Sequence, residues 1–314
     1  MSKHKKQHFI PRSYLKAWCD PKTPKGQQPY VWQFSKDGKR VKNKSPENIF
    51  YENEMYTIKT ENGERDLTLE HGLQSLEDKF CKIRDQIISK NLEIDRETKF
   101  IICAFMAAMH SRTKARRDYQ KKQWQKVVDV GEKLKRAFDE AKPEQREAMI
   151  NMSKINSDGP SLSFEDVRML AKDPIKVSLL TQIEVTAPLL FKLEMAVFNT
   201  IGIPGFITSD TPCVWSDPKA YKRHPYCRTP ALMYESIEIT LPISPKQLIL
   251  LNRQGIRGYI DLLPPFADEI NRGTRFNCDE YFIVNSNCKK EYWFNKGKEP
   301  EDSWEKTHSK KKTT

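Results

Sequence analysis

The chain has 314 residues, of which 38% are hydrophobic and 10% aromatic, so it carries enough apolar material for a sizeable core. No apolar run approaches the roughly 20 residues of a membrane span, and the lysine-rich N-terminus lacks the apolar stretch of a signal peptide. The net charge of +12 invites nucleic acid as a partner, and we expect a globular, cytoplasmic protein with no membrane partner.

The segment from Gln7 to Leu15 places a histidine and an arginine on either side of Pro11. His8 titrates near neutrality and can serve as a general acid or base, while Arg12 can hold a phosphate through two hydrogen bonds. Residues four apart share one face of an extended strand, so both side chains can address one ligand. The pair suits phosphoryl chemistry; the alternative is that it fastens this segment to the body of the protein.

Short β-rich runs follow, and we expect a hairpin region over residues 7–65. The runs at 30–34 and 54–58 are rich in aromatic and β-branched residues. An Asp-Gly pair follows the first run and an Asn-Gly pair follows the second, and such pairs are typical of tight hairpin turns.

Residues 66–199 predict a central helical bundle. The first helix shows apolar residues every three or four positions, at Leu69, Leu73, Leu76, Phe80, Ile83 and Ile87. A second helix begins near Asp95 and is apolar nearly all round until His110, which indicates a buried central helix.

Two glutamates of the first helix are candidate catalytic residues. Glu70 and Glu77 lie seven residues apart and therefore share one helix face, from which both carboxylates can point at one metal ion or one arginine. A salt bridge to Arg112 is one interpretation. A catalytic or magnesium-binding pair is the other.

A strongly basic run covers residues 114–136, where nine Lys and Arg residues stand against three acidic ones. Such a run is either a solvated helix face or a surface that contacts a phosphate backbone. In the second case the candidate nucleic-acid-binding residues are Lys114, Arg116, Arg117, Lys121 and Lys122. Residues 151–164 then read as an exposed loop.

Residues 200–285 return to a β-rich pattern, with strand candidates at 205–208, 237–241, 247–251 and 281–284 and a short helix around 265–274. Asp210 follows the first of these strands, at a place where functional side chains often lie. The alternative is a turn in which its carboxylate caps backbone amides. Asn271 and Arg275, one helical turn apart, can add a polar edge to the same cleft, or serve only as capping and surface residues.

The seven cysteines include no CxxC pair and no tight cluster with histidine, which is typical of reduced thiols. Zinc would need Cys213, His224 and Cys227 to converge with a distant fourth ligand, so the pattern argues against it. Magnesium stays open as a cofactor.

Several motifs occur in a fixed order along the chain: Gln7 to Leu15, Leu69-Glu70-x-x-Leu73-x-x-x-Glu77, Phe105 to Arg112, Gly205 to Pro212, Thr240 to Pro245 and the later Asn271. Together they resemble the bacterial domain-of-unknown-function family 4238. The resemblance covers residues 7 to about 285 and implies no activity, cofactor or catalytic residue, because none is established for that family.

Strands at both ends with helices between them predict an α+β fold, in which N-terminal hairpins join a C-terminal mixed or antiparallel sheet. We expect a single domain over residues 1–285, followed by a C-terminal strand and a basic tail over 286–314.

The functional hypothesis is a nuclease-like hydrolase acting on nucleic acid or nucleotide phosphodiesters, which would suit bacterial host defence or a toxin. Its candidate catalytic residues are His8, Arg12, Glu70, Glu77, Arg112 and Asp210. The alternative is a non-catalytic module that binds nucleic acid or protein and whose polar residues are structural. Monomer and oligomer both stay open.

Overall fold

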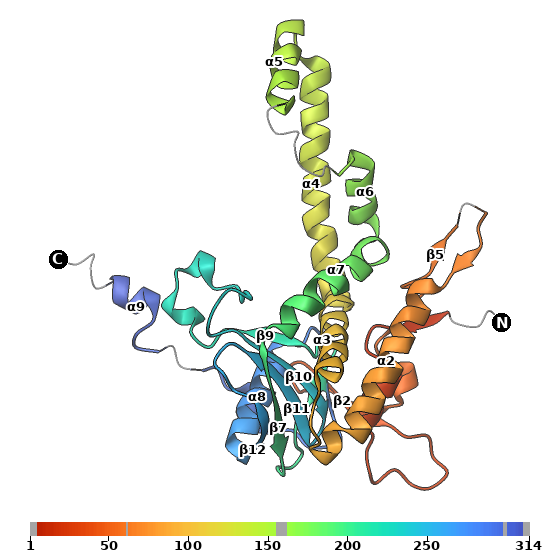
Figure 1. Ribbon diagram of the computed structural model, residues 1–314, viewed down its shortest axis with the longest axis vertical. Helices are drawn as coiled ribbons and strands as arrows, with labels where there is room; N and C mark the ends of the chain where they lie inside the picture. The colour runs from red at the N-terminus through yellow and green to blue at the C-terminus, as the bar shows by residue number, and fades with distance from the viewer. Residues whose placement is uncertain (1–4, 61, 155–161, 298–299, 310–314) are drawn as a thin grey trace.

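The computed structural model describes residues 5–60, 62–154, 162–297 and 300–309, and it shows an α+β protein (Figure 1). The helices are α1 (Arg12–Leu15), α2 (Thr68–Gln86), α3 (Arg96–Ser111), α4 (Lys114–Glu140), α5 (Pro143–Lys154), α6 (Phe164–Lys172), α7 (Pro174–Phe191), α8 (Pro264–Asn277) and α9 (Trp304–Ser309). The strands are β1 (Lys6–His8), β2 (Val31–Ser35), β3 (Val41–Lys44), β4 (Tyr51–Asn53), β5 (Ile58–Lys59), β6 (Arg65–Asp66), β7 (Glu194–Thr200), β8 (Thr208–Ser209), β9 (Val214–Ser216), β10 (Glu238–Ser244), β11 (Gln247–Asn252), β12 (Gly258–Leu262) and β13 (Tyr281–Val284).

An antiparallel four-stranded sheet joins the N-terminal hairpin to the C-terminal part of the chain. Its order is β3-β2-β13-β8, with Phe34 of β2 opposite Phe282 of β13. The two rings stack with centroids 5.2 Å apart. This pairing confirms the expected closure of the first hairpin onto the C-terminal strands. The remaining N-terminal strands pair among themselves, β1 with β4 and β5 with β6.

A five-stranded mixed sheet, in the order β12-β7-β11-β10-β9, forms the second layer, and β12 runs parallel to β7. The run of four consecutive apolar residues in β11 is typical of a strand buried on both faces. Leu248 and Leu250 pack toward α8, whereas Ile249 and Leu251 belong to the main core. The sheet therefore lies between α8 on one side and the helices of the central region on the other (Figure 1).

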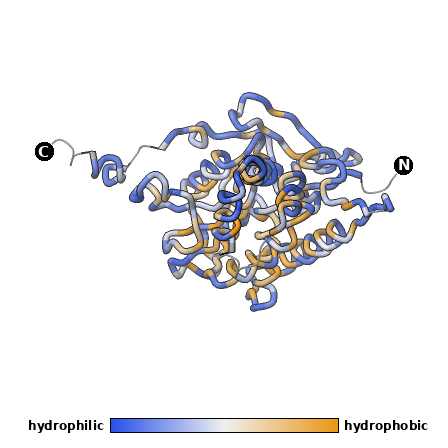
Figure 2. The backbone as a smooth tube through the Cα atoms, turned by 90° about the horizontal axis from the view of Figure 1, so that it is seen from above, coloured by the Kyte–Doolittle hydropathy of each residue, from blue (hydrophilic) through white to orange (hydrophobic). Residues whose placement is uncertain are grey.

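Helix α3 is the buried central helix that the sequence predicts. Nine of its 16 residues are buried, and Phe105 stacks on Phe80 of α2 with ring centroids 3.7 Å apart. The helix ends at Ser111, and α4 starts anew where the Thr113 side chain accepts a hydrogen bond from the Arg116 amide. Figure 2 shows hydrophobic segments gathered in the body and mainly hydrophilic segments toward both ends of the chain.

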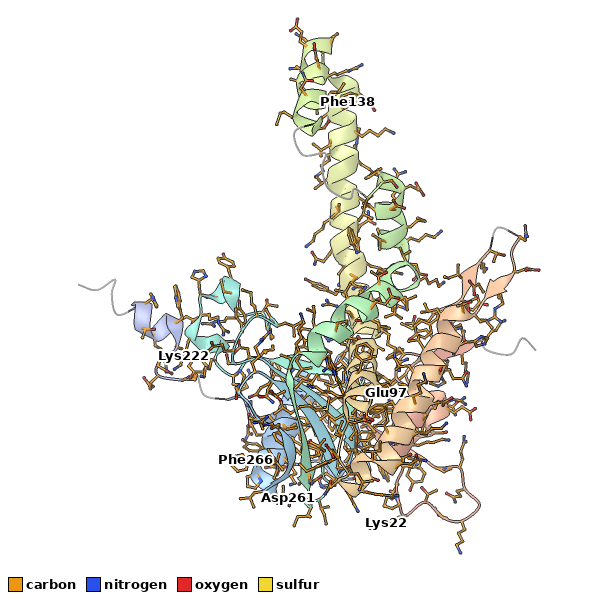
Figure 3. The ribbon with its side chains drawn as sticks, in the orientation of Figure 1. Lys22, Glu97, Phe138, Lys222, Asp261 and Phe266 are labelled. Carbon is orange, nitrogen blue, oxygen red and sulfur yellow. The ribbon has the colours of Figure 1, made fainter. Side chains whose placement is uncertain are left out.

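Helix α4 projects from the body as a stalk (Figure 1). Its 27 residues span about 40 Å at 1.5 Å per residue. Of these residues, all of them described, only Val128 is buried, under the packing of α6. A side chain at Gly131 would collide with the Phe164 ring, which explains a glycine in the middle of this helix. Figure 3 places Phe138 near the far end of the stalk, well away from Glu97 in the body.

Several local expectations are wrong. The run 54–58 is mostly a turn between β4 and β5, and only Thr208 of the strand expected at 205–208 lies in a strand, β8. Residues 151–154 belong to α5 rather than to a loop, and residues 155–161 lie outside the described part of the chain. The described residues after 286 contain no strand, because the aromatic run there folds into a single 3-10 turn, Glu291–Phe294. That turn buries Trp293 completely and lets its indole Nε1 donate to Asp268 at 3.0 Å, so the run anchors onto α8.

No helix within the described ranges combines the length and hydropathy needed to cross a membrane.

Candidate functional site

Four of the six candidate catalytic residues line one cleft of about 640 Å³: His8, Arg12, Glu70 and Glu77. Strand β1 and the start of α1 form one wall, α2 forms another, and the segment 45–47 closes the third side. Buried Arg84 of α2 donates to the carbonyls of Ser13 and Tyr14, at 3.3 Å each. This contact holds α1 against α2 and thereby fixes the two main walls relative to each other.

His8 is held neutral inside this cleft. Burial, followed by the nearby charge of Arg12, lowers its pKa from 6.5 to about 4. Its ring nitrogen Nε2 lies 3.3 Å from the Glu47 carbonyl oxygen. Because a carbonyl oxygen only accepts, the proton sits on Nε2 and the lone pair on Nδ1. The expectation that His8 titrates near neutrality is therefore wrong: at neutral pH the imidazole is uncharged, and it is a weaker base than an ordinary histidine side chain.

Arg12 presents its guanidinium at the opening of the cleft. Its side chain is 56% exposed, and Nη1 lies 3.3 Å from Oε1 of Glu47, which is 53% exposed. An ion pair this open to solvent contributes little stability. An anionic ligand can therefore compete with Glu47 for the guanidinium.

Glu70 is the group in the cleft that titrates near neutrality. Burial, and next the negative charge of Glu77, raise its pKa from 4.5 to about 7, although Arg112 and Arg12 oppose the shift. Glu70 is therefore about half protonated at physiological pH, the state that suits a general acid or base.

Glu77 is fixed by the buried Arg112. The Arg112 side chain is 1% exposed, and its Nη1 donates to Glu77 Oε1 at 2.6 Å. Arg112 thus lies behind the cleft wall and reaches the cleft through Glu77. The salt-bridge interpretation of this pair is confirmed.

Asp210 does not join these residues. Its carboxylate accepts hydrogen bonds from the backbone amides of Asp279, Glu280 and Tyr281, at 2.7 to 2.8 Å. Burial outweighs these bonds and raises the pKa of Asp210 to about 6. The expectation of a shared cleft is wrong, because the side chain is used as a turn cap where β8 pairs with β13.

Asn271 and Arg275 also lie away from the cleft. Buried Asn271 accepts from the Ile207 amide at 2.9 Å and donates to the Gly205 carbonyl at 2.8 Å, so both ends of its amide are used. Arg275 lies over the Phe294 ring, 5.0 Å from its centroid. The expected polar edge to the candidate cleft is therefore absent at these two positions.

The basic run begins with residues that attach the stalk to the body. Arg117 pairs with Glu52 and, at 2.9 Å, with Asp118, while Lys114 lies 3.2 Å from Glu280. Arg116 lies over the Tyr119 ring. Lys121 and Lys122 follow farther along α4, and no ion pair involves them within the described residues.

Several lining residues were missed from the sequence: Lys6, Lys16, Glu47, Gln74 and Asp78. Gln74 and Asp78 lie four and eight positions after Glu70, so helical spacing alone could have placed them on the same face. Glu47 comes from the turn after β3, for which the sequence carries no such signal.

The motifs that carry the family resemblance meet in the folded chain. The Tyr14 hydroxyl donates to the Pro242 carbonyl at 2.5 Å and lies 2.7 Å from the Thr208 hydroxyl. Three residues beyond the first motif, the Trp18 indole donates to the Phe206 carbonyl of the Gly205–Pro212 motif at 2.9 Å. The Gln7 side-chain amide donates to the Thr57 hydroxyl and accepts from the Tyr56 backbone amide. These parts of the motifs therefore tie distant segments together.

Among the described residues, no three His, Cys, Asp or Glu side chains are placed to hold a metal ion. The fold and the cleft define an α+β protein with a carboxyl group of raised pKa facing an exposed arginine. The chain belongs to the family described as protein of unknown function (DUF4238), whose model matches residues 6–287. Comparisons with curated proteins and with solved structures found no match.

Proposed function

We propose that the protein hydrolyses phosphodiester bonds in nucleic acids or nucleotides, and that the cleft lined by His8, Arg12, Glu70 and Glu77 is its active site. The observation that carries the proposal is the placement of Glu70 and Arg12 in one cleft. The pKa of Glu70 is raised to about 7, and the Arg12 side chain is exposed to solvent. A titrating carboxyl beside an exposed guanidinium combines a proton donor with an anion ligand.

Each residue has a defined part in the proposed reaction. Arg12 donates to the nonbridging oxygens of the phosphodiester in place of Glu47. Neutral His8 takes a proton from a water molecule as the water oxygen forms a bond to phosphorus. The bond from phosphorus to the leaving oxygen breaks, and the protonated Glu70 carboxyl gives that oxygen its proton.

Glu77 and Arg112 position the reacting groups. The charge of Glu77, fixed by Arg112, helps to keep Glu70 protonated near neutral pH. A proton must then pass from His8 back to Glu70 through solvent, which restores both groups for the next turnover.

The test uses the full-length protein with dye-quencher RNA and DNA oligonucleotides, each with added Mg²⁺ and with EDTA. We expect cleavage by the wild type and a loss of at least about 100-fold in Glu70→Gln, which cannot donate the proton. Gln74→Ala, a change of an uncharged residue on the same helix face, is the control and keeps cleavage within a few fold. Equal cleavage by Glu70→Gln and the wild type would refute the assignment.

The same variant tests the proposed setting in host defence or as a toxin. If the activity acts on cellular nucleic acid, expression of the wild type in bacteria should arrest growth, whereas Glu70→Gln should not.

A separate observation favours a second function: the side chains of Asp210, Asn271 and Arg112 make hydrogen bonds within the protein. In that alternative the protein is a non-catalytic module that binds nucleic acid or protein. Binding of oligonucleotides by the wild type without cleavage of any of them would support it.

A further inference from the structure

A row of three cations lies along the outer strand of the four-stranded sheet. Every residue of β3 is exposed, and Lys42 and Lys44 lie two apart in the strand and so point to one face. Exposed Arg40 comes directly before the strand. In the register of the sheet, Lys42 is opposite Gln33 and Lys44 is opposite Val31. Directly opposed residues of an antiparallel pair share a face. Lys42 and Lys44 therefore border the same sheet face as Gln33, a face whose Val31 and Ile283 are buried in the main core, so the accessible part lies at its margin.

Two hollows lie on this face, separated by Glu280 and Tyr281, which line both. One has a volume of about 290 Å³ and is also lined by Gln33 and Lys44. The other has a volume of about 420 Å³ and takes in Lys36, Arg40 and Arg275. The row of cations thus follows the edge of both.

The charges of the row are unbalanced. Within the described residues Arg40, Lys42 and Lys44 make no side-chain ion pair. Most acidic groups that line the hollows have other partners. Glu280 lies 3.2 Å from Lys114, Glu52 pairs with Arg117, Asp210 accepts three backbone amides, and Asp37 accepts from the Ser35 hydroxyl and the Lys39 amide. Asp37 and Asp279 still place negative charge at the two hollows, Asp37 close enough to Arg40 for the two charges to interact. An anionic ligand would supply the missing counter-charge.

This face leads to the catalytic cleft. Tyr51 lines the smaller hollow, and its ring centroid lies 5.5 Å from that of His8, which lines the cleft. Lys44 lines the same hollow, and the next residues, Ser45 to Glu47, form a wall of the cleft. The ends of the two sites are therefore in contact.

We propose that this sheet face binds single-stranded nucleic acid, with phosphates on the row of Arg40, Lys42 and Lys44 and a base against the Tyr281 ring. The proposal deepens the proposed function and rests on it for the nature of the ligand. Phosphate groups match the unbalanced cations, and an aromatic ring on a sheet is a platform on which an unpaired base can stack. A duplex conceals the faces of its bases and cannot fill the hollows in this way.

A structural explanation of the row is that lysines on an edge strand prevent pairing with another chain. That explanation covers β3 alone. Lys36 donates to the Cys278 carbonyl and Arg275 lies over the Phe294 ring, so these two cations also have internal contacts. The edge-strand explanation does not account for a tyrosine that lines both hollows.

The experiment measures binding by fluorescence anisotropy with labelled single-stranded RNA, single-stranded DNA and a hairpin duplex, each of about 12 nucleotides, a length within the usual site size. The test variant is Arg40→Glu/Lys42→Glu/Lys44→Glu. The matched control is Lys192→Glu/Lys219→Glu/Lys246→Glu, which makes the same charge change at three exposed lysines elsewhere.

We expect the wild type to prefer the single strands, and the β3 variant to bind them at least about tenfold more weakly. The slope of log K against log salt should fall by about 2 with three lost contacts at about 0.7 each. The control should stay within about twofold of the wild type. Equal weakening in both variants, equal binding of the duplex, or no binding by the wild type would overturn the proposal.

Tyr281 is tested separately because it is partly buried. Tyr281→Phe keeps the ring and should bind as the wild type does, whereas Tyr281→Leu should bind several-fold more weakly at an unchanged salt slope. Thermal unfolding of both variants checks that they are folded. Wild-type affinity in a folded Tyr281→Leu would remove the stacking part of the proposal.

Failure of this inference is distinguishable from failure of the proposed function. Selective binding that depends on β3, without cleavage of any substrate, upholds the binding face and overturns the hydrolase. Cleavage at the wild-type rate by the β3 variant, with undiminished binding, does the reverse. The RNA and DNA arms show which single strand is preferred.

Discussion

Replacing Glu77 by glutamine should destabilise the protein strongly, because it removes the counter-charge of a guanidinium that is only 1% exposed. Breaking a buried pair from one side costs about 3–5 kcal/mol. Glu77 is 18% exposed and glutamine keeps an oxygen acceptor, so we expect a somewhat smaller cost, about 2–4 kcal/mol. Urea unfolding followed by tryptophan fluorescence measures the change.

The control is Glu47→Gln, the same substitution in the same cleft. Its partner Arg12 is 56% exposed, and an exposed pair contributes about 0–1 kcal/mol. The reasoning is refuted if Glu77→Gln proves no more destabilising than Glu47→Gln. The change should also lower the pKa of Glu70 from about 7, because the charge of Glu77 raises it, but burial should keep it above 4.5. Carboxyl-carbon NMR shifts followed against pH read out that titration.

Three further outcomes are expected. Cleavage should follow a bell-shaped pH profile, falling below about pH 4 as His8 gains a proton and above about pH 7 as Glu70 loses its own; a profile flat from 5 to 9 would contradict this. Folding raises the pKa of Asp210 from 3.8 to about 6, so the stability that Asp210 contributes should be lost as pH rises through that window. The free energy of unfolding of the wild type relative to that of Asp210→Asn should therefore fall between about pH 4 and pH 6; a difference that stays constant would exclude the linkage. Gly205→Ala should unfold at clearly lower urea than Gly26→Ala, since both have positive φ but only the first meets a backbone carbonyl; equal midpoints would count against it.

Local patterns predicted the parts of the fold that depend on neighbouring residues. The apolar spacing of α2 and the nearly continuous apolar character of α3 identified both helices, because periodicity follows directly from burial. The shared face of Glu70 and Glu77 followed from helix geometry in the same way. The salt bridge from Glu77 to Arg112 was one of two interpretations that the sequence left open, and the structure has it.

The failures at the candidate site involve partners far away in the chain. Arg117 meets Glu52 across 65 positions, and Asp210 meets the amides of Asp279 to Tyr281 across about 70. Nothing in the composition of either segment specifies such a pairing. Asp210 stands at the end of a strand in both its functional and its structural interpretation, so only the register of β8 on β13 decides between them.

Side chains whose polar atoms are all hydrogen-bonded within the protein stabilise the fold, whereas those that keep a free donor or acceptor can bind a ligand. In the opening segment, Gln7 and Tyr14 are buried and use their polar atoms within the protein. His8 keeps a free lone pair, and Arg12 makes only an exposed ion pair. A side chain that fastens the segment cannot also turn toward a substrate without breaking the contact that positions it. The motif thus divides into residues that build the cleft wall and residues that face into it. The proposed reaction accordingly assigns its steps to His8 and Arg12, together with Glu70, and none to Gln7 or Tyr14.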